Sequence, residues 1–207
     1  LDTGMRIFIL ILLVLFSVTS TFAQKNKADS IARLLAIEKT DSNKVTLLWN
    51  MANVCNIYNP DTAMLLSREA LDLARKIKFV KGESMALGIA ANTFVKIGNY
   101  PRALEFYLQK LKLEEKRDDP GNMATVTMNI GVVYVYQEEY RKAIINYFKA
   151  DSILTANNLE MLKYNIALNL GDVYNRINVY DSAFIFFNKS LGIAKKMNDV
   201  DLIGASM

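Results

Sequence analysis

The sequence predicts an all-α fold, an α-α superhelix of stacked antiparallel helix pairs. The first observation is that aromatic and alanine positions recur at one fixed interval, which indicates stacked repeats. The recurring sets are Tyr100, Tyr140 and Tyr180; Ala103, Ala143 and Ala183; Phe94, Tyr134 and Tyr174; and Tyr107, Tyr147 and Phe187. The second is that apolar residues recur at helical spacing and no segment alternates with a period of two, so we expect no strand.

Residues 1–23 have the pattern of a secretory signal. Arg6 precedes the apolar run 7–16, and the small residues at 21 and 23 make Gln24 the expected first mature residue. The run is shorter than the ~20 apolar residues that span a bilayer, and an uncleaved membrane anchor is the alternative. We therefore expect an exported protein that is periplasmic or faces the periplasm.

After the signal, one amphipathic helix over 24–41 precedes four helix pairs, each with a first helix (helix A) and a second helix (helix B). The predicted units span about 42–80, 81–120, 121–159 and 160–199. The predicted A helices span 44–57, 84–97, 123–137 and 160–177, and the predicted B helices span 62–78, 101–117, 141–156 and 181–197. Pro101 opens helix B of the second unit, where its missing N–H costs nothing. Residues 118–122, Asp-Asp-Pro-Gly-Asn, are predicted to end that helix.

The last residues have the pattern of a fifth unit that has just begun, because 200–207 align with 80–87 three repeats earlier. We expect the natural chain to continue into further repeats, and a membrane tether through that C-terminal part is one option. Nothing in the given sequence caps the last helix B, so we expect apolar residues of that helix to face water in part. The expected residues are Phe184, Ile185, Leu191 or Ile193.

The recurring positions resemble the tetratricopeptide repeat family, in which small residues let two helices cross closely and aromatic residues fill the remaining space. The third unit carries Gly131, Tyr134, Tyr140, Ala143, Tyr147 and Ala150, and the fourth carries Gly171, Tyr174, Tyr180, Ala183, Phe187 and Ser190. The second unit departs from the pattern at Lys110, where alanine is expected. The period, from Tyr100 to Tyr140, also exceeds the usual ~34. The resemblance implies a superhelix whose A helices line a concave face, and exported chains of this type are similar to sensor regions of Bacteroidetes envelope signalling proteins.

Catalytic and cofactor chemistry has no candidate residues here. The chain has no histidine, which removes imidazole base chemistry and the commonest metal ligand. Its one cysteine, Cys55, has no candidate base nearby in sequence, and a small buried or groove-lining thiol is the favoured interpretation over a nucleophile. The net charge is +4, but basic and acidic residues are interleaved, so no nucleic-acid partner is expected. We expect a chain that is not an enzyme and holds no cofactor or metal.

The candidate binding residues lie on the A helices beside the small-residue positions. They are Asn92, Lys96, Asn129, Tyr136, Asn165, Asn169, Asp172 and Arg176. Asparagine donates and accepts hydrogen bonds at once, so a ladder of asparagines suits the amide groups of a bound peptide. The alternative is that Asn129 and Asn169 tie adjacent helices together. The predicted function is a protein- or peptide-binding module, and the alternative function is a structural scaffold that binds through its convex face or the end of the array.

Overall fold

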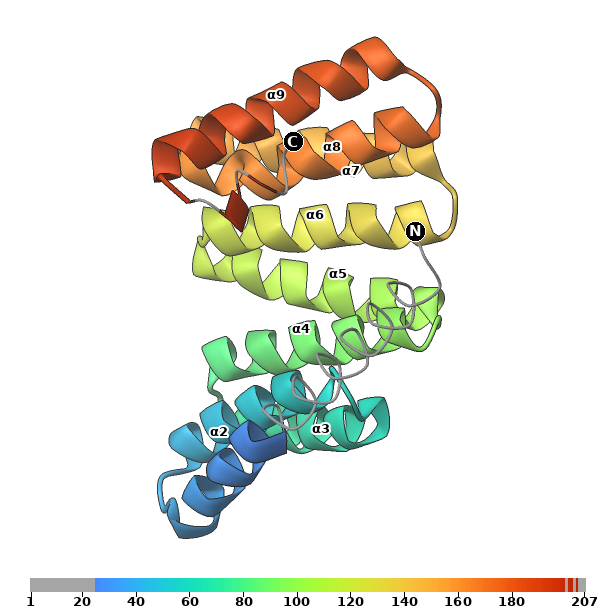
Figure 1. Ribbon diagram of the computed structural model, residues 1–207. Coiled ribbons are helices and arrows are strands. Elements are labelled where there is room, and N and C mark those ends of the chain that lie inside the picture. The colour runs from blue at the N-terminus through green and yellow to red at the C-terminus, as the bar shows by residue number, and fades with distance from the viewer. Residues whose placement is uncertain (1–24, 200, 203, 205–207) are drawn as a thin grey trace, which may run out of the picture. The chain divides into compact units, whose positions relative to one another are not determined.

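The computed structural model describes residues 25–199, 201, 202 and 204, so the expected signal at 1–23 lies outside the described residues. Residues 25–37 are helical. The elements that follow are α2 (Asp41–Cys55), α3 (Pro60–Lys76), α4 (Val80–Lys96), α5 (Tyr100–Arg117), α6 (Pro120–Tyr136), α7 (Tyr140–Ala156), the 3-10 helix η1 (Glu160–Lys163), α8 (Tyr164–Arg176) and α9 (Tyr180–Met197) (Figure 1). The described residues contain no strand, which confirms the all-α prediction.

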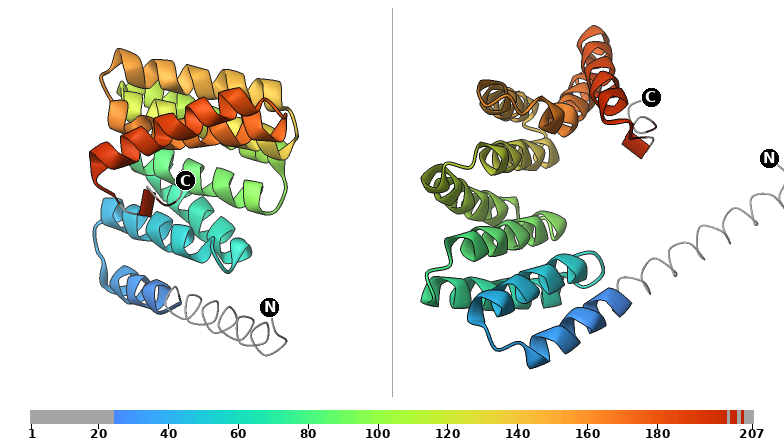
Figure 2. Two further views of the ribbon diagram at one scale, coloured as in Figure 1. Left: turned by 45° about the horizontal axis from the view of Figure 1, so that its top comes forward. Right: turned by 90° about the vertical axis from the view of Figure 1, so that its left-hand side faces the viewer.

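The chain forms two compact units, one ending at Ile97 and the other beginning at Gly98. In the first, α2 packs on α3 and α3 packs on α4. In the second, α5 packs on α6, α6 on α7, and α8 on α9, as antiparallel neighbours (Figure 2). The helix over 25–37 joins the first unit, because Ala28 is buried with Val54, Cys55 and Ala63. None of the described helices combines the length and the apolarity needed to cross a membrane.

A left-handed residue follows each described helix from α3 to α9, at regular intervals. These residues are Lys78, Gly98, Asp118, Glu138, Asn158, Asn178 and Asn198, with φ between 51° and 76°. After all of these residues except Gly98, the next backbone amide donates to a carbonyl near the helix end, as from Glu139 to Tyr134 and from Val179 to Tyr174, both at 2.9 Å. This is the Schellman arrangement, which satisfies carbonyls that a helix end leaves unpaired. Each turn is therefore fixed by backbone geometry.

Because the turns are evenly spaced, the helices begin in the same register. The first residues of the elements from α3 onward are at 60, 80, 100, 120, 140, 160, 164 and 180. Three predicted starts of helix A, at 44, 84 and 123, are wrong, since α2 begins at Asp41, α4 at Val80 and α6 at Pro120. Asp119 caps α6 by accepting the Asn122 backbone N–H at 3.0 Å, and this hydrogen bond lowers the pKa of the Asp119 carboxyl. The sequence 118–122 thus ends one helix and begins the next.

The predicted helix over 160–177 is also corrected, because its first turn is the 3-10 helix η1. The tighter turn begins with a hydrogen bond from the Leu162 amide to the Leu159 carbonyl, at 3.1 Å. It buries the Lys163 side chain against α7, where its ammonium donates to the Thr155 hydroxyl and pairs with Glu160 at 2.8 Å. The 3-10 turn therefore occurs where the buried Lys163 ammonium obtains its hydrogen-bond and ion-pair partners.

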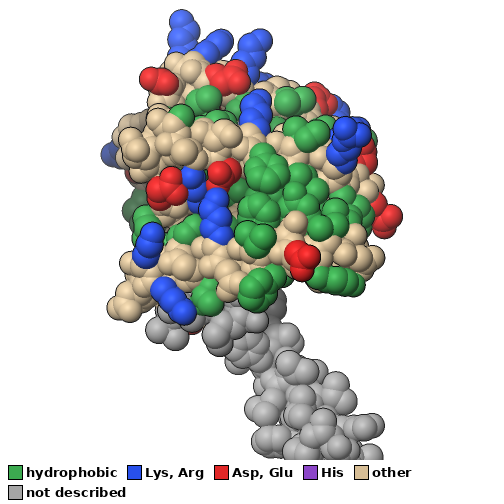
Figure 3. All heavy atoms as spheres, turned by 90° about the horizontal axis from the view of Figure 1, so that it is seen from above, with side chains coloured by type: hydrophobic (Ala, Val, Ile, Leu, Met, Phe, Trp, Pro, Cys, Tyr) green, Lys and Arg blue, Asp and Glu red, His purple; other side chains and the backbone are tan. Residues whose placement is uncertain are grey.

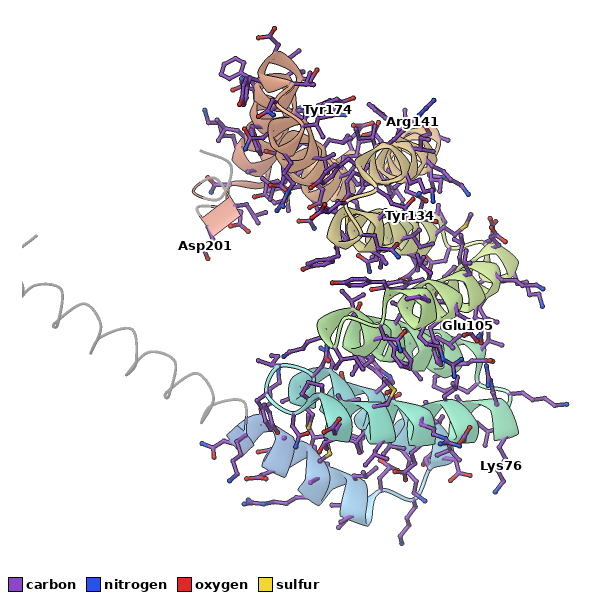
Figure 4. All side chains as sticks on the ribbon, turned by 90° about the vertical axis from the view of Figure 1, so that its right-hand side faces the viewer. Lys76, Glu105, Tyr134, Arg141, Tyr174 and Asp201 are labelled. Carbon is purple, nitrogen blue, oxygen red and sulfur yellow. The ribbon has the colours of Figure 1, made fainter. Side chains whose placement is uncertain are left out.

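In the core of the second unit, helix A and helix B cross where a glycine packs against an aromatic ring. A Cβ at Gly131 would lie 2.6 Å from Cε1 of Tyr147, and one at Gly171 would lie 2.6 Å from the ring of Phe187. Tyr147 is 1% exposed, so its ring cannot move aside. The neighbouring aromatic positions also join helix A to helix B. Tyr134 lies under the Lys142 ammonium, and Tyr174 stacks on Phe186 with ring centroids 5.5 Å apart (Figure 4).

The outer surface of α9 carries exposed apolar side chains. Phe184 is 69% exposed and Ile185 is 62% exposed, as expected from the sequence. Figure 3 looks down on this end and shows hydrophobic side chains gathered there. Ile193 is only 9% exposed, so its expected contact with water is wrong. It packs with Tyr164 and Leu202, and the Tyr164 hydroxyl donates to the Leu202 carbonyl at 2.9 Å.

One substitution made at two glycines tests the helix crossing. Gly131→Ala should destabilise the protein by about 1–3 kcal/mol, because the new methyl group overlaps the buried Tyr147 ring. Gly192→Ala lies on α9 with nothing within 4 Å of the new Cβ, and it should stabilise by about 0.5–1 kcal/mol through helix propensity. Thermal unfolding measures both changes. Effects of the same sign would contradict this account of the crossing.

Candidate functional site

Two helices of the second unit present matching rows of side chains. The rows are Thr125, Asn129, Val132 and Tyr136 on α6, and Asn165, Asn169, Asp172 and Arg176 on α8. The spacing i, i+4, i+7, i+11 places each row on one helix face, and each member of the second row lies one full repeat after its counterpart in the first. Every member is exposed or half-buried. We call these eight residues the paired ladder. At about 1.5 Å per residue each row is about 16 Å long.

The two rows lie on neighbouring helices of the second unit. Helices α6 and α8 touch each other, and Thr125 and Asn165 line the same cavity at one end. At the other end, side chains of both rows influence the pKa of the buried Tyr147. Burial raises the pKa of Tyr147, and the nearby Asp172, Arg176 and Tyr136 side chains also affect it. The paired ladder is therefore a largely polar surface that draws on two neighbouring helices of the second unit.

The asparagine amides of the paired ladder are not used within the fold. The side chains of Asn129, Asn165 and Asn169 make no hydrogen bond to any part of the chain that the structure describes. By contrast, the Asn146 amide on α7 donates to the Lys142 carbonyl at 2.9 Å. The interpretation that Asn129 and Asn169 tie adjacent helices by hydrogen bonds is therefore wrong. Each retains two N–H donors and a carbonyl acceptor.

The opposite end of the paired ladder is charged and aromatic. The Asp172 carboxylate accepts from the Arg176 guanidinium at 2.7 Å, and this hydrogen bond raises the pKa of Arg176. Both side chains are exposed, so the pair contributes little to stability and can exchange partners. Tyr136 stacks on Tyr100 with ring centroids 5.8 Å apart and an interplanar angle of 7°. This end offers an anion, a cation and a flat apolar ring.

The structure brings six of the eight predicted site residues together in the paired ladder. The other two, Asn92 and Lys96, lie on α4 of the first compact unit. The Lys96 ammonium donates to the backbone carbonyls of Asn56 and Ile57 at the end of α2. A cation at a helix C-terminus is stabilising, so the Lys96 side chain has a role in the fold. Asn92 is half-buried and also interacts within the chain.

The remaining reactive groups are engaged in packing. Cys55 is buried with its Sγ 3.5 Å from the Tyr58 hydroxyl, and that contact is the main reason why the pKa of Tyr58 rises to about 12. Lys110, in place of the expected alanine, is buried 3.1 Å from the Glu114 carboxylate, and burial lowers the pKa of Lys110. Within 25–199, 201, 202 and 204, no three His, Cys, Asp or Glu side chains come together as metal ligands would.

The middle of the sequence contains a known repeat. Residues 86–121 match the family model described as Tetratricopeptide repeat. These residues form a tetratricopeptide repeat. The resemblance drawn from the aromatic and alanine positions is thereby confirmed. No curated protein matches the sequence.

Solved structures with tetratricopeptide-type folds resemble the chain at low sequence identity. A Rap protein in complex with Competence and Sporulation Factor aligns over 92% of this chain and 56% of its own, with a TM-score of 0.80 and 18% identity. Aspartyl phosphate phosphatase F from Bacillus subtilis aligns over 89% of this chain and 52% of its own (TM-score 0.78, 15% identity). PH0952 from Pyrococcus horikoshii, a signal transduction ATPase with numerous domains that has a tetratricopeptide repeat sensor, aligns over 89% of this chain and 29% of its own (TM-score 0.77, 17% identity). The chain thus has a tetratricopeptide-type fold and spans about half of the first two proteins.

Proposed function

We propose that this chain is a non-enzymatic module that binds a peptide or a peptide segment of a protein along the paired ladder. The observation that carries the proposal is the set of unused amides of Asn129, Asn165 and Asn169 on two adjacent, parallel rows. A tetratricopeptide-type array holds the backbone positions of such a row in fixed register, so only the asparagine side chains must be ordered when a ligand binds. Preorganised groups of this kind lower the entropic cost of binding.

The dimensions of the paired ladder suit a short extended segment. An extended chain rises about 3.3 Å per residue, so a row of about 16 Å faces about five residues of a peptide. Peptide main chains present alternating donors and acceptors, which asparagine amides can match without regard to sequence. Tyr136 would then contact an apolar side chain, and the Asp172–Arg176 pair would contact a charged one.

Two further observations support a binding function. One structurally similar protein was solved with Competence and Sporulation Factor bound, and another is described as carrying a tetratricopeptide repeat sensor. Several basic side chains are paired with acids, as in the pairs of Arg102 with Glu105 and of Lys189 with Asp151. We therefore propose a protein or peptide partner and no nucleic-acid partner.

Replacing the central asparagines tests this proposal. The double variant Asn129→Ala/Asn169→Ala should weaken binding of a selected peptide by about 0.5–1.5 kcal/mol per site, because each side chain loses a hydrogen bond to the ligand. Its free energy of unfolding should change by less than about 0.5 kcal/mol per site, since neither amide is paired in the fold. Titration calorimetry and thermal unfolding measure the two effects.

The control for these variants is Asn146→Ala on α7, outside the paired ladder. Its amide donates to the Lys142 carbonyl, so it removes an intrahelical contact without touching the proposed site. Peptide affinity should be unchanged. If the double variant binds as tightly as this control, the peptide does not lie on the paired ladder.

We also propose that the protein is exported and is the interaction region of an envelope signalling protein. The pattern of residues 1–23 supports export, and the repeat type supports an interaction role. Mass spectrometry of the native protein should find an amino terminus at Gln24 in the periplasmic fraction. An intact amino terminus in the membrane fraction would support the uncleaved anchor instead.

The second candidate function is a scaffold that assembles through the end of the array. It is favoured by the exposed apolar surface of α9, where Tyr180 and Phe184 stand one helical turn apart beside Ile185. Their counterparts one repeat earlier, Tyr140 and Ile144, pack against the core of the second unit. The positions of Tyr180 and Phe184 are thus partly covered in α7 and open in α9, whereas Ile185 is about as exposed as its counterpart Ile145.

Oligomeric state distinguishes the scaffold from the peptide-binding module. Phe184→Glu should convert a self-associating protein into a monomer, because a carboxylate cannot be buried without a partner. Light scattering over a range of protein concentrations measures the change. If the wild-type protein stays monomeric at all concentrations, self-assembly through α9 is ruled out and the paired ladder is left as the proposed binding surface.

A further inference from the structure

A cavity opens beside the first pair of residues of the paired ladder. It has a volume of about 220 Å³ and lies wholly within the second compact unit. The side chains that define it come mainly from α6, η1, α8 and α9. They include Thr125, Met128, Met161, Leu162, Asn165 and Met197. Among the residues that the structure describes, no charged side chain lines it.

The size of the cavity limits what it can hold. A cavity of about 150 Å³ holds a benzene molecule, whereas pockets for drug-sized ligands begin at about 300 Å³. A volume between these limits suits one large apolar side chain. Three of the lining residues are methionines, whose flexible and polarisable side chains adapt to differently shaped apolar groups. A charged side chain would find no partner there.

The mouth of the cavity can hold the backbone that carries such a side chain. Asn165 is exposed at the mouth, and its amide is unused within the described residues. The Thr125 hydroxyl donates to the Gly121 carbonyl at 2.8 Å, so its oxygen can still accept a hydrogen bond. Asn165 and Thr125 therefore belong both to the cavity and to the paired ladder, and the two surfaces are continuous.

We propose that this cavity is the specificity pocket of the module, and that it receives one large apolar side chain, such as Leu, Met or Phe, of the bound peptide. The inference rests on the proposed function, because the peptide main chain must lie on the paired ladder for its side chain to enter. The asparagines would bind the main chain of any peptide, and the cavity would favour peptides with a large apolar side chain at one position. Affinity and selectivity would thus come from different residues.

Selection from a phage-displayed library of random peptides on the full chain tests the proposal. Wild-type protein should enrich peptides that share a large apolar residue at one fixed position. Leu162→Glu places a carboxylate in the cavity wall at a side chain that is 52% exposed, so the fold should tolerate it. This variant should lose the apolar preference, and it should bind a wild-type-selected peptide about tenfold or more weakly, because that side chain is no longer buried in an apolar site.

The matched control is Leu108→Glu on α5, where the leucine is 57% exposed and does not line the cavity. It should select the same peptides as the wild type, and thermal unfolding should show that both variants are folded. If Leu162→Glu and Leu108→Glu select alike, or if the enriched peptides share no apolar position but still require Asn169, the cavity proposal is wrong and the paired ladder stands. Failure to enrich any peptide, or enrichment that survives the Asn129→Ala/Asn169→Ala change, would overturn both proposals.

Discussion

The left-handed residue that follows each described helix from α3 to α9 constrains every other feature of this chain. After six of these residues the next amide donates back to a carbonyl near the helix end, so these turns share one geometry. Apart from Gly98, these residues have side chains. For a residue with a side chain, the left-handed conformation costs about 1–2 kcal/mol. The hydrogen bonds of the turn and the packing of the helices offset this cost. Evenly spaced helices result, and their faces stay in phase.

The paired ladder results from this even spacing of the helices. Because α6 and α8 are separated by two turns of the same type, residues one repeat apart occupy the same place on the two helices. Asn129 and Asn169 therefore lie at equivalent positions on neighbouring rows. The crossing of Gly131 with Tyr147, repeated at Gly171 with Phe187, holds each A helix against its B helix. The rigidity that a binding surface needs is supplied by the core beneath it.

The aromatic and alanine positions were sufficient to predict the fold, because tight helix crossings leave few choices of residue. The starts of the A helices were not predictable from the same positions. Pro120 and the sequence around it contain both helix-ending and helix-starting residues, and only the capping contact of Asp119 decides between them. The 3-10 turn of η1 depends on the tertiary contacts of Lys163, which local sequence does not show. Thr125 was missed as a site residue, although its position one repeat before Asn165 could have revealed it.

The regular turns also determine how such a chain can change in length. Each residue added within a helix turns everything after it by about 100° about the helix axis. A single insertion in α7 would therefore rotate the asparagines of α8 away from those of α6 and bring the apolar side of α8 to the surface. Gains or losses of a whole helix pair keep the phase, because they move the following elements by one complete repeat. Related chains should therefore differ in length by whole repeats, and a binding row should lengthen or shorten by complete helix pairs.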